Sequence, residues 1–177
     1  MKYLVTWGLL SLIVLSACNR INLKPDGDGS RLQKVEFETL DLRAHFGDSC
    51  FVYSQLDPEE AWVVRSVAEY SSLDSALQDR WTTFNTDPDP ACLGYSLPEI
   101  DFTEYTLLIA GAGGSGCNPG ELEHVIYQCE AAEEYTVVTT MQETGLCQAY
   151  WIETGWILVK NLDPDYTVKF SQGLEEE

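Results

Sequence analysis

Residues 135–141 read Tyr-Thr-Val-Val-Thr-Thr-Met, and this run of aromatic and β-branched residues favours a β-strand. Similar short runs recur along the chain and are separated by clusters of Gly, Pro and Asp, which is typical of a β-rich domain. The other expected strands cover residues 35–42, 62–67, 105–110, 121–129, 150–160 and 166–170. We therefore expect a mainly β (α+β) fold, an antiparallel β-sandwich-like domain with one helix.

The pattern that begins at Ser72 predicts this helix. Ser72 is a suitable N-cap, Asp74 lies in the first turn, and apolar residues follow at helical spacing, namely Leu73, Ala76, Leu77 and Trp81. Trp81 and Trp62 each lie within an apolar pattern, so both are expected to pack in the core.

The first 18 residues have the pattern of an export signal. Lys2 is followed by an apolar run from Tyr3 to Leu15, which is too short to span a membrane well, and then by Leu15-Ser16-Ala17-Cys18. This ending resembles the lipobox of bacterial lipoproteins, in which the cysteine receives a diacylglyceryl group and becomes the first mature residue. The resemblance implies removal of residues 1–17, a lipid on Cys18, and an extracytoplasmic protein anchored in the cell envelope, with the outer membrane favoured.

Residues 18–34 are polar, rich in Gly and Asp, and lack a sustained apolar period, so they are expected to form a flexible tether. Residues 35–177 then form a single β-rich domain. The chain has 29 acidic and 10 basic residues and a formal net charge of −19. Without a basic stripe it is not expected to bind nucleic acid. The acyl chains, and not the acidic surface, are expected to contact membrane lipid.

The stretch Gly111-Ala112-Gly113-Gly114-Ser115-Gly116 matches the pattern G-x-G-x-x-G of dinucleotide-binding proteins. Pro119 and Gly120 follow these glycines too late for a helix N-terminus to reach a phosphate, and repeated βαβ units are lacking. We therefore expect a flexible loop between strands and no nucleotide cofactor.

A family resemblance covers about residues 60–170. It rests on a helix that ends near Trp81, on Leu97-Pro98-Glu99-Ile100-Asp101-Phe102, and on a strand at residues 105–111 that leads into the Gly-rich stretch. In these features the chain resembles the C-terminal domain of the protease complex subunit PrcB family, which includes many exported lipoproteins. The five cysteines after Cys18 and an Asp- and Pro-rich insertion before Leu97 depart from the family pattern.

The resemblance implies a β-rich accessory or binding domain, of the kind that stabilises a protease partner, and it implies no catalytic residues. It also favours a strand over residues 121–129. The residues themselves leave a helix open there, because Leu122, Val125, Ile126 and Cys129 have helical spacing.

Catalytic and metal-binding patterns are sparse. The chain has two histidines, His45 and His124, as possible bases, and His45 lies too close in sequence to Cys50 to indicate a catalytic pair. Zinc-binding spacings of Cys and His are also lacking, and cysteines of exported proteins usually pair. We expect a protein that is not an enzyme and holds no metal or cofactor, although a hydrolase with carboxylates that cannot be placed remains an alternative.

Two binding functions remain beside that alternative. The first is an accessory or protein-interaction domain with an envelope protein as partner. The second is a small-ligand or glycan-binding domain that uses Tyr150, Trp151 and Trp156. Trp151 and Trp156 flank Glu153-Thr154-Gly155, which could be a tight turn or a bulge within one long strand.

The cysteines predict two disulfides. If residues 121–129 and 135–141 form a hairpin, the numbers of opposite residues sum to about 264, and Cys117 then faces Cys147. The same register places Cys129 opposite Tyr135 and without a cysteine partner, so Cys129 is expected to be a free, buried thiol. Cys50 and Cys92 are left to pair by elimination.

Overall fold

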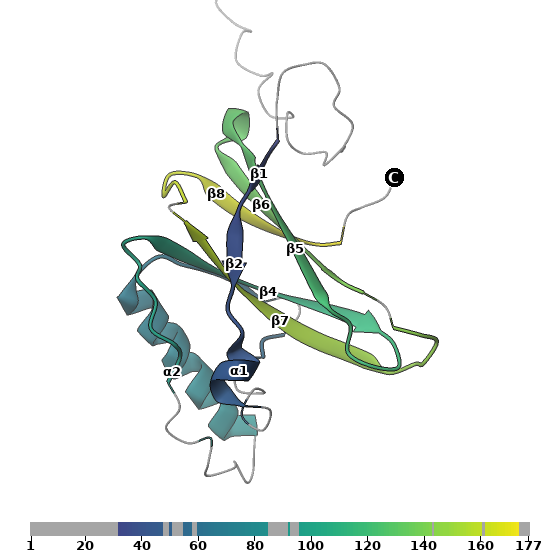
Figure 1. Ribbon diagram of the computed structural model, residues 1–177. Coiled ribbons are helices and arrows are strands. Elements are labelled where there is room, and N and C mark those ends of the chain that lie inside the picture. Colours follow the sequence, from purple (N-terminus) through teal and green to yellow (C-terminus); the bar gives the residue numbers. More distant parts are fainter. Residues whose placement is uncertain are drawn as a thin grey trace, which may run out of the picture.

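The computed structural model describes residues 32–47, 50, 55–57, 60–84, 92, 96–142, 144–160 and 162–173. Within these ranges two β-sheets lie face to face, and the helices cover the outer face of one of them (Figure 1). The expected mainly β, sandwich-like fold is confirmed. The predicted lipidation site, Cys18, and the expected tether up to residue 31 lie outside the described residues.

The first sheet contains β1 (Gln33–Val35), β5 (Leu122–Cys129), β6 (Glu134–Met141) and β8 (Thr167–Gln172), in the order β1-β5-β6-β8. The second sheet contains β2 (Phe37–Thr39), β7 (Tyr150–Lys160), β4 (Tyr105–Ser115) and β3 (Ala61–Val64), in the order β2-β7-β4-β3. Neighbouring strands are antiparallel except β6 and β8, which are parallel. Because β1 begins at Gln33, the sheet starts two residues before the expected domain boundary.

Strands β4 and β7 form the centre of the second sheet and are buried on both faces. Successive side chains of a strand point to opposite faces, so each strand supplies two sets of apolar residues. Leu107, Ile109 and Trp156 pack against the helices, whereas Leu108 and Ile157 pack against the first sheet. Burial on both sides explains why these strands read as continuous apolar runs in the sequence.

Helix α2 (Val67–Phe84) lies along the outer face of the second sheet (Figure 1). The predicted N-cap was wrong, because the helix begins at Val67 and the hydroxyl of Ser72 donates to the carbonyl oxygen of Ala68 inside it. Ser66 occupies the start instead, where its Oγ accepts from the N–H of Glu69 at 3.3 Å. Residues 62–67 were expected to be a strand throughout, but β3 ends at Val64 and α2 begins at Val67.

A second, short helix was not expected. Residues 35–42 were predicted to form one strand, but they contain the last residue of β1, all of β2 and the first residue of α1 (Leu42–Phe46). The side chain of Asp41 accepts a hydrogen bond from the N–H of Ala44 and so caps α1. Leu42 and Phe46 are buried, and they carry α1 into the same core as α2.

Residues 122–129 form a strand, so the helical alternative for this segment is wrong. The hairpin of β5 and β6 exists, but its register differs by one residue from the expected one, because Cys129 pairs with Glu134 and not with Tyr135. The connection causes this shift. A 3-10 turn (Glu130–Ala132) is followed by Glu133 in the left-handed conformation, with φ of 52°, and the chain re-enters the sheet at Glu134.

The Gly-rich stretch is not the expected flexible loop, because residues 111–115 continue β4 and pair with β7. Its glycines leave room for side chains that cross the strand. A Cβ atom on Gly113 would lie 2.0 Å from the hydroxyl oxygen of Tyr150, and one on Gly114 would lie 3.1 Å from the sulfur of Met141. The glycines therefore serve packing, and the segment lacks the strand-loop-helix geometry of a phosphate-binding site.

Among the described residues, none of the helices combines the length and apolar character that crossing a membrane requires.

Candidate functional site

The three aromatic residues predicted to bind a ligand do not form one surface. β7 runs without interruption from Tyr150 to Lys160, so neither a turn nor a bulge brings Trp151 and Trp156 together. Trp156 is 2% exposed in the core beneath the helices. Trp151 points to the opposite face, where its Nε1 donates to the carbonyl oxygen of Gly116 at 2.9 Å. Tyr150 alone is largely exposed, at 63%.

Trp62 also departs from expectation, because it lies on edge strand β3 and is 37% exposed.

The two predicted disulfides are confirmed. Cys117 pairs with Cys147, with Cα atoms 4.7 Å apart, and Cys50 pairs with Cys92, with Cα atoms 5.3 Å apart. The first joins the end of β4 to the segment before β7 and is exposed, whereas the second lies in the core beneath the helices.

The prediction that Cys129 is a free thiol was wrong. Cys129 is disulfide-bonded, and its partner is none of the four cysteines above, because those pair with each other.

Among the residues that the structure describes, neither histidine contacts a nucleophile or a carboxylate as a catalytic base would. His45 is exposed on α1, and its Nε2 lies 3.0 Å from the carbonyl oxygen of Ser96. His124 points between the sheets, where its Nδ1 lies 3.0 Å from the buried hydroxyl of Thr139 and burial lowers its pKa. A desolvated, neutral imidazole held against a buried hydroxyl contributes to packing.

A small cavity opens between the two sheets, lined by Glu60, Thr139 and Gln172 among others. Its volume is about 90 Å³. Because a water molecule occupies roughly 30 Å³ in the liquid, the cavity has room for about three waters. It is much smaller than the clefts of roughly 300–1,000 Å³ that usually bind ligands. Groups of three or more His, Cys, Asp or Glu side chains arranged to hold a metal ion were not found in the described part of the chain.

The larger concavity is a groove of about 420 Å³ between the first half of α2 and residues 96–102, a size within the range of binding clefts. Its lining combines apolar side chains with two carboxylates. The lining residues are Val67, Tyr70, Ser71, Asp74, Ser96, Leu97, Pro98, Glu99, Ile100 and Phe102. We refer to it below as the α2 groove.

The two sides of the α2 groove are fixed to each other. The hydroxyl of Tyr70 donates to the carbonyl oxygen of Pro98 at 2.8 Å, and the rings of Tyr70 and Phe102 meet edge to face with centroids 5.3 Å apart. Burial, with a smaller contribution from the charge of Asp74, raises the pKa of Tyr70 well above its ordinary value, so this donor keeps its proton. The groove is therefore shaped before anything binds to it.

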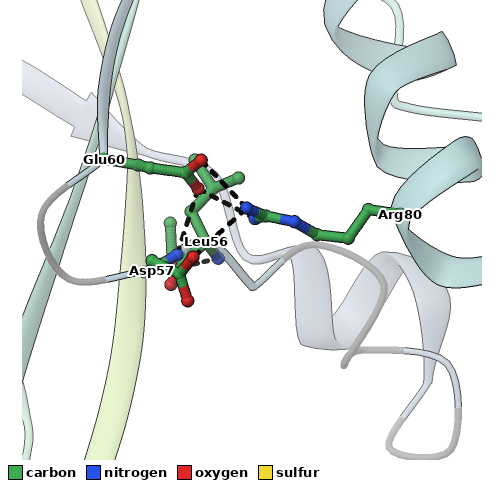
Figure 2. Close-up of polar contacts among 5 residues, drawn as sticks. Leu56, Asp57, Glu60 and Arg80 are labelled. Atoms are coloured by element: carbon green, nitrogen blue, oxygen red, sulfur yellow. Dashed lines mark hydrogen bonds and ion pairs between the residues drawn. The ribbon is translucent and has the colours of Figure 1, made fainter. Parts of the chain in front are cut away.

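Helix α2 is also tied to the start of β3. The guanidinium of Arg80 contacts both carboxylate oxygens of Glu60, at 2.8 and 2.9 Å, and one oxygen of Asp57 at 3.3 Å (Figure 2). The hydrogen bond from Arg80 lowers the pKa of Glu60. This bidentate pair helps to set the position of the helix that forms one wall of the groove.

Among the apolar residues that line the groove, Val67 is the most exposed, at 66%. Sequence reasoning missed it because residues 62–67 read as one strand. The segment Leu97-Pro98-Glu99-Ile100-Asp101-Phe102 was recognised only as part of a family resemblance. In this segment apolar and acidic residues alternate, which indicates that one side of it is buried and the other exposed. The pattern does not show that α2 forms the opposite side of the groove.

We found no matching family model, curated protein or solved structure for this chain.

Proposed function

We propose that this protein is a lipid-anchored, extracytoplasmic lipoprotein whose β-rich domain binds another protein and is not itself an enzyme. The main support is the α2 groove, because it is preformed, is lined mostly by apolar side chains, and is large enough to take side chains of a partner. The export signal and Cys18 support the location in the cell envelope.

An accessory subunit of an envelope protease is one form of this proposal. It is supported by the resemblance to the protease complex subunit PrcB family. The segment 97–102, which carries part of that resemblance, forms one wall of the α2 groove.

Photo-crosslinking in the native envelope tests the proposal. A photoreactive residue is placed at Val67, at the lip of the groove, in the full-length lipidated protein. The matched control places it at Leu146, which is fully exposed and apolar but lies outside the groove. We expect one stoichiometric crosslinked protein from position 67 and none of that species from position 146. Equal crosslinking at both positions, or none at position 67, would contradict the proposal.

A further inference from the structure

Strand β7 has an edge that β2 covers only in part. β2 pairs with residues 157–159 of β7, and the N–H of Leu40 donates to the carbonyl oxygen of Trp156. The backbone groups of every second residue point to the same side of a strand, so those of Tyr150 and Ile152 point to the side of Trp156. In the described part of the chain, no residue pairs with the N–H and C=O groups that Tyr150 and Ile152 present on this side. Residues 150–152 therefore form an open edge, which we call the β7 edge.

The β7 edge lacks the charges that keep natural sheet edges from pairing. β1 and β8, the outer strands of the first sheet, carry Lys34 and Lys169, and a lysine on an edge strand opposes pairing with another strand. The β7 edge instead has the exposed apolar side chains of Tyr150 and Ile152, and residues 144–152 contain no charged residue. Because aromatic and β-branched residues favour strands, this edge is suited to accept a further strand.

The β7 edge is complementary to a second copy of itself. If two copies pair antiparallel about a two-fold axis at Trp151, Tyr150 of each copy lies opposite Ile152 of the other, and each such pair exchanges both backbone hydrogen bonds. Cross-strand pairs of an aromatic and a β-branched residue stabilise a sheet. The same register places Glu153 opposite Ala149 of the other copy. Although each chain has a net charge of −19, like charges are therefore not opposed along the paired stretch.

We infer that two copies of this chain associate through the β7 edge and join their second sheets into one continuous sheet. The added strand continues the ladder that β2 begins on the same side of β7. This inference goes beyond the proposed function and does not depend on the α2 groove, which residues 150–152 do not line. The paired stretch is short, so the interface lies at the low end of interface sizes and the association in solution is weak and reversible. A lipid anchor strengthens it, because two copies confined to one membrane have a higher effective concentration.

Disulfide trapping in the lipidated full-length protein tests this inference. At the two-fold axis the Cα atoms of the two Trp151 residues are expected to lie about 4.5 Å apart, a separation that a disulfide can bridge. Mild oxidation of Trp151→Cys should therefore give a covalent dimer, and non-reducing peptide mapping should show a link between the two copies of position 151. The matched control is Glu153→Cys. Its two thiols would be roughly 13 Å apart, four residues along the strands, so its yield of dimer should be several-fold lower.

A second pair of changes, made together with Trp151→Cys, tests the hydrogen bonds of the edge. Ile152→Pro removes the N–H that points to the open side, where proline is tolerated, so the domain should still fold while the yield of dimer falls several-fold. Ile152→Val keeps this N–H and a β-branched side chain, and it should leave the yield unchanged. Equal trapping at positions 151 and 153, or a yield that Ile152→Pro does not change, would overturn the inference. A link from position 151 to a different protein would also overturn it.

The parent protein in detergent gives a measurement that needs no substitution. Analytical ultracentrifugation should show monomer and dimer in proportions that depend on protein concentration. Monomer alone at every concentration would overturn the inference. The proposed function is tested separately, by crosslinking from Val67, and it would stand in each of these cases.

Discussion

Nδ1 of His124 lies 3.0 Å from the hydroxyl oxygen of Thr139, its cross-strand neighbour between β5 and β6. Both side chains point between the sheets, and Thr139 is 1% exposed. The other edge of the imidazole lies against Gly155 of β7, so one histidine bridges the two layers of the sandwich.

The burial of His124 makes stability depend on pH. Burial lowers the pKa of His124 below its ordinary value of about 6.5, so between the two pKa values the unfolded chain binds more protons than the folded one. Its contribution is fully present above about pH 6.5 and is lost as pH falls through the folded pKa. We expect the free energy of unfolding to fall between pH 7 and pH 5, and to fall less in His124→Gln. Urea unfolding followed by tryptophan fluorescence measures this. The surface variant His45→Gln is the control, and its free energy of unfolding should change with pH as in the wild type. The same pH dependence in His124→Gln as in the wild type would contradict the prediction.

The contact of His124 with Gly155 gives a second prediction. A Cβ atom at Gly155 would lie 2.1 Å from Nε2 of His124, so Gly155→Ala must displace the ring or the strand. Such overpacking costs about 1–3 kcal/mol of the free energy of unfolding. The double variant His124→Ala, Gly155→Ala should lose less than the sum of the two single variants, because it removes the clash. Strict additivity in denaturant unfolding would show that the two residues do not press on each other.

The ion pair of Arg80 with Glu60 should contribute modestly. The two side chains are 31% and 35% exposed, so solvent screens the pair, and Glu60→Gln should destabilise the domain by about 0.5–1 kcal/mol. The pKa of Glu60 is lowered, so this contribution is present above about pH 4.5 and is lost as pH falls through the folded pKa. Denaturant unfolding at pH 7 and at pH 3 measures the difference, which should be smaller at the lower pH. Glu130→Gln is the control, and an equal loss there would refute the assignment.

The central strands could be read from the sequence because burial on both faces gives them long apolar runs. The Gly-rich end of β4 could not, because glycine runs usually mark loops. Here the side chains of Tyr150 and Met141 occupy the space that Cβ atoms would fill, and that packing comes from distant strands. The same cause left a turn or a bulge open at Glu153-Thr154-Gly155, whereas the regular strand places Trp151 and Trp156 on opposite faces.

The α2 groove could not be predicted from local pattern either. The helix was expected to start at Ser72, which left Val67 in a predicted strand, whereas the helix begins at Val67 and Ser66 precedes it. The opposite wall depends on the contact between Tyr70 and Pro98, which are 28 residues apart.

The two disulfide pairs were predicted correctly although the predicted hairpin register was wrong by one residue. Cys117 and Cys147 lie beyond the open end of that hairpin, and an error of one residue still left them close together.

The two confirmed disulfides should differ in their reduction. Cys117 and Cys147 are exposed, whereas Cys50 and Cys92 are each 4% exposed. Mild reductant without denaturant should therefore open the 117–147 bond first, and the 50–92 bond only when the domain unfolds. Alkylation followed by peptide mass spectrometry gives the order of reduction. Earlier reduction of the 50–92 bond would contradict the prediction.

The 117–147 disulfide should also contribute to stability. Replacing both cysteines, by Cys117→Ser and Cys147→Ser, opens a loop of 30 residues and should destabilise the domain by about 3–4 kcal/mol.

The last prediction concerns Cys18, where the lipobox resemblance implies a thioether to diacylglycerol. Two acyl chains hold a protein in a membrane stably, whereas one chain holds it only marginally. We expect the membrane fraction to contain a mature chain that begins with diacylated Cys18, and Cys18→Ser to release the protein from the membrane. Mass spectrometry of the N-terminal peptide and fractionation measure both. A thioether and a disulfide cannot share one sulfur atom, so lipidation of Cys18 excludes a disulfide between Cys18 and Cys129. Non-reducing peptide mapping of the membrane fraction therefore decides between the two. If the main species were a peptide that links residues 18 and 129, the lipid anchor would be refuted. The proposed membrane location would then be refuted with it.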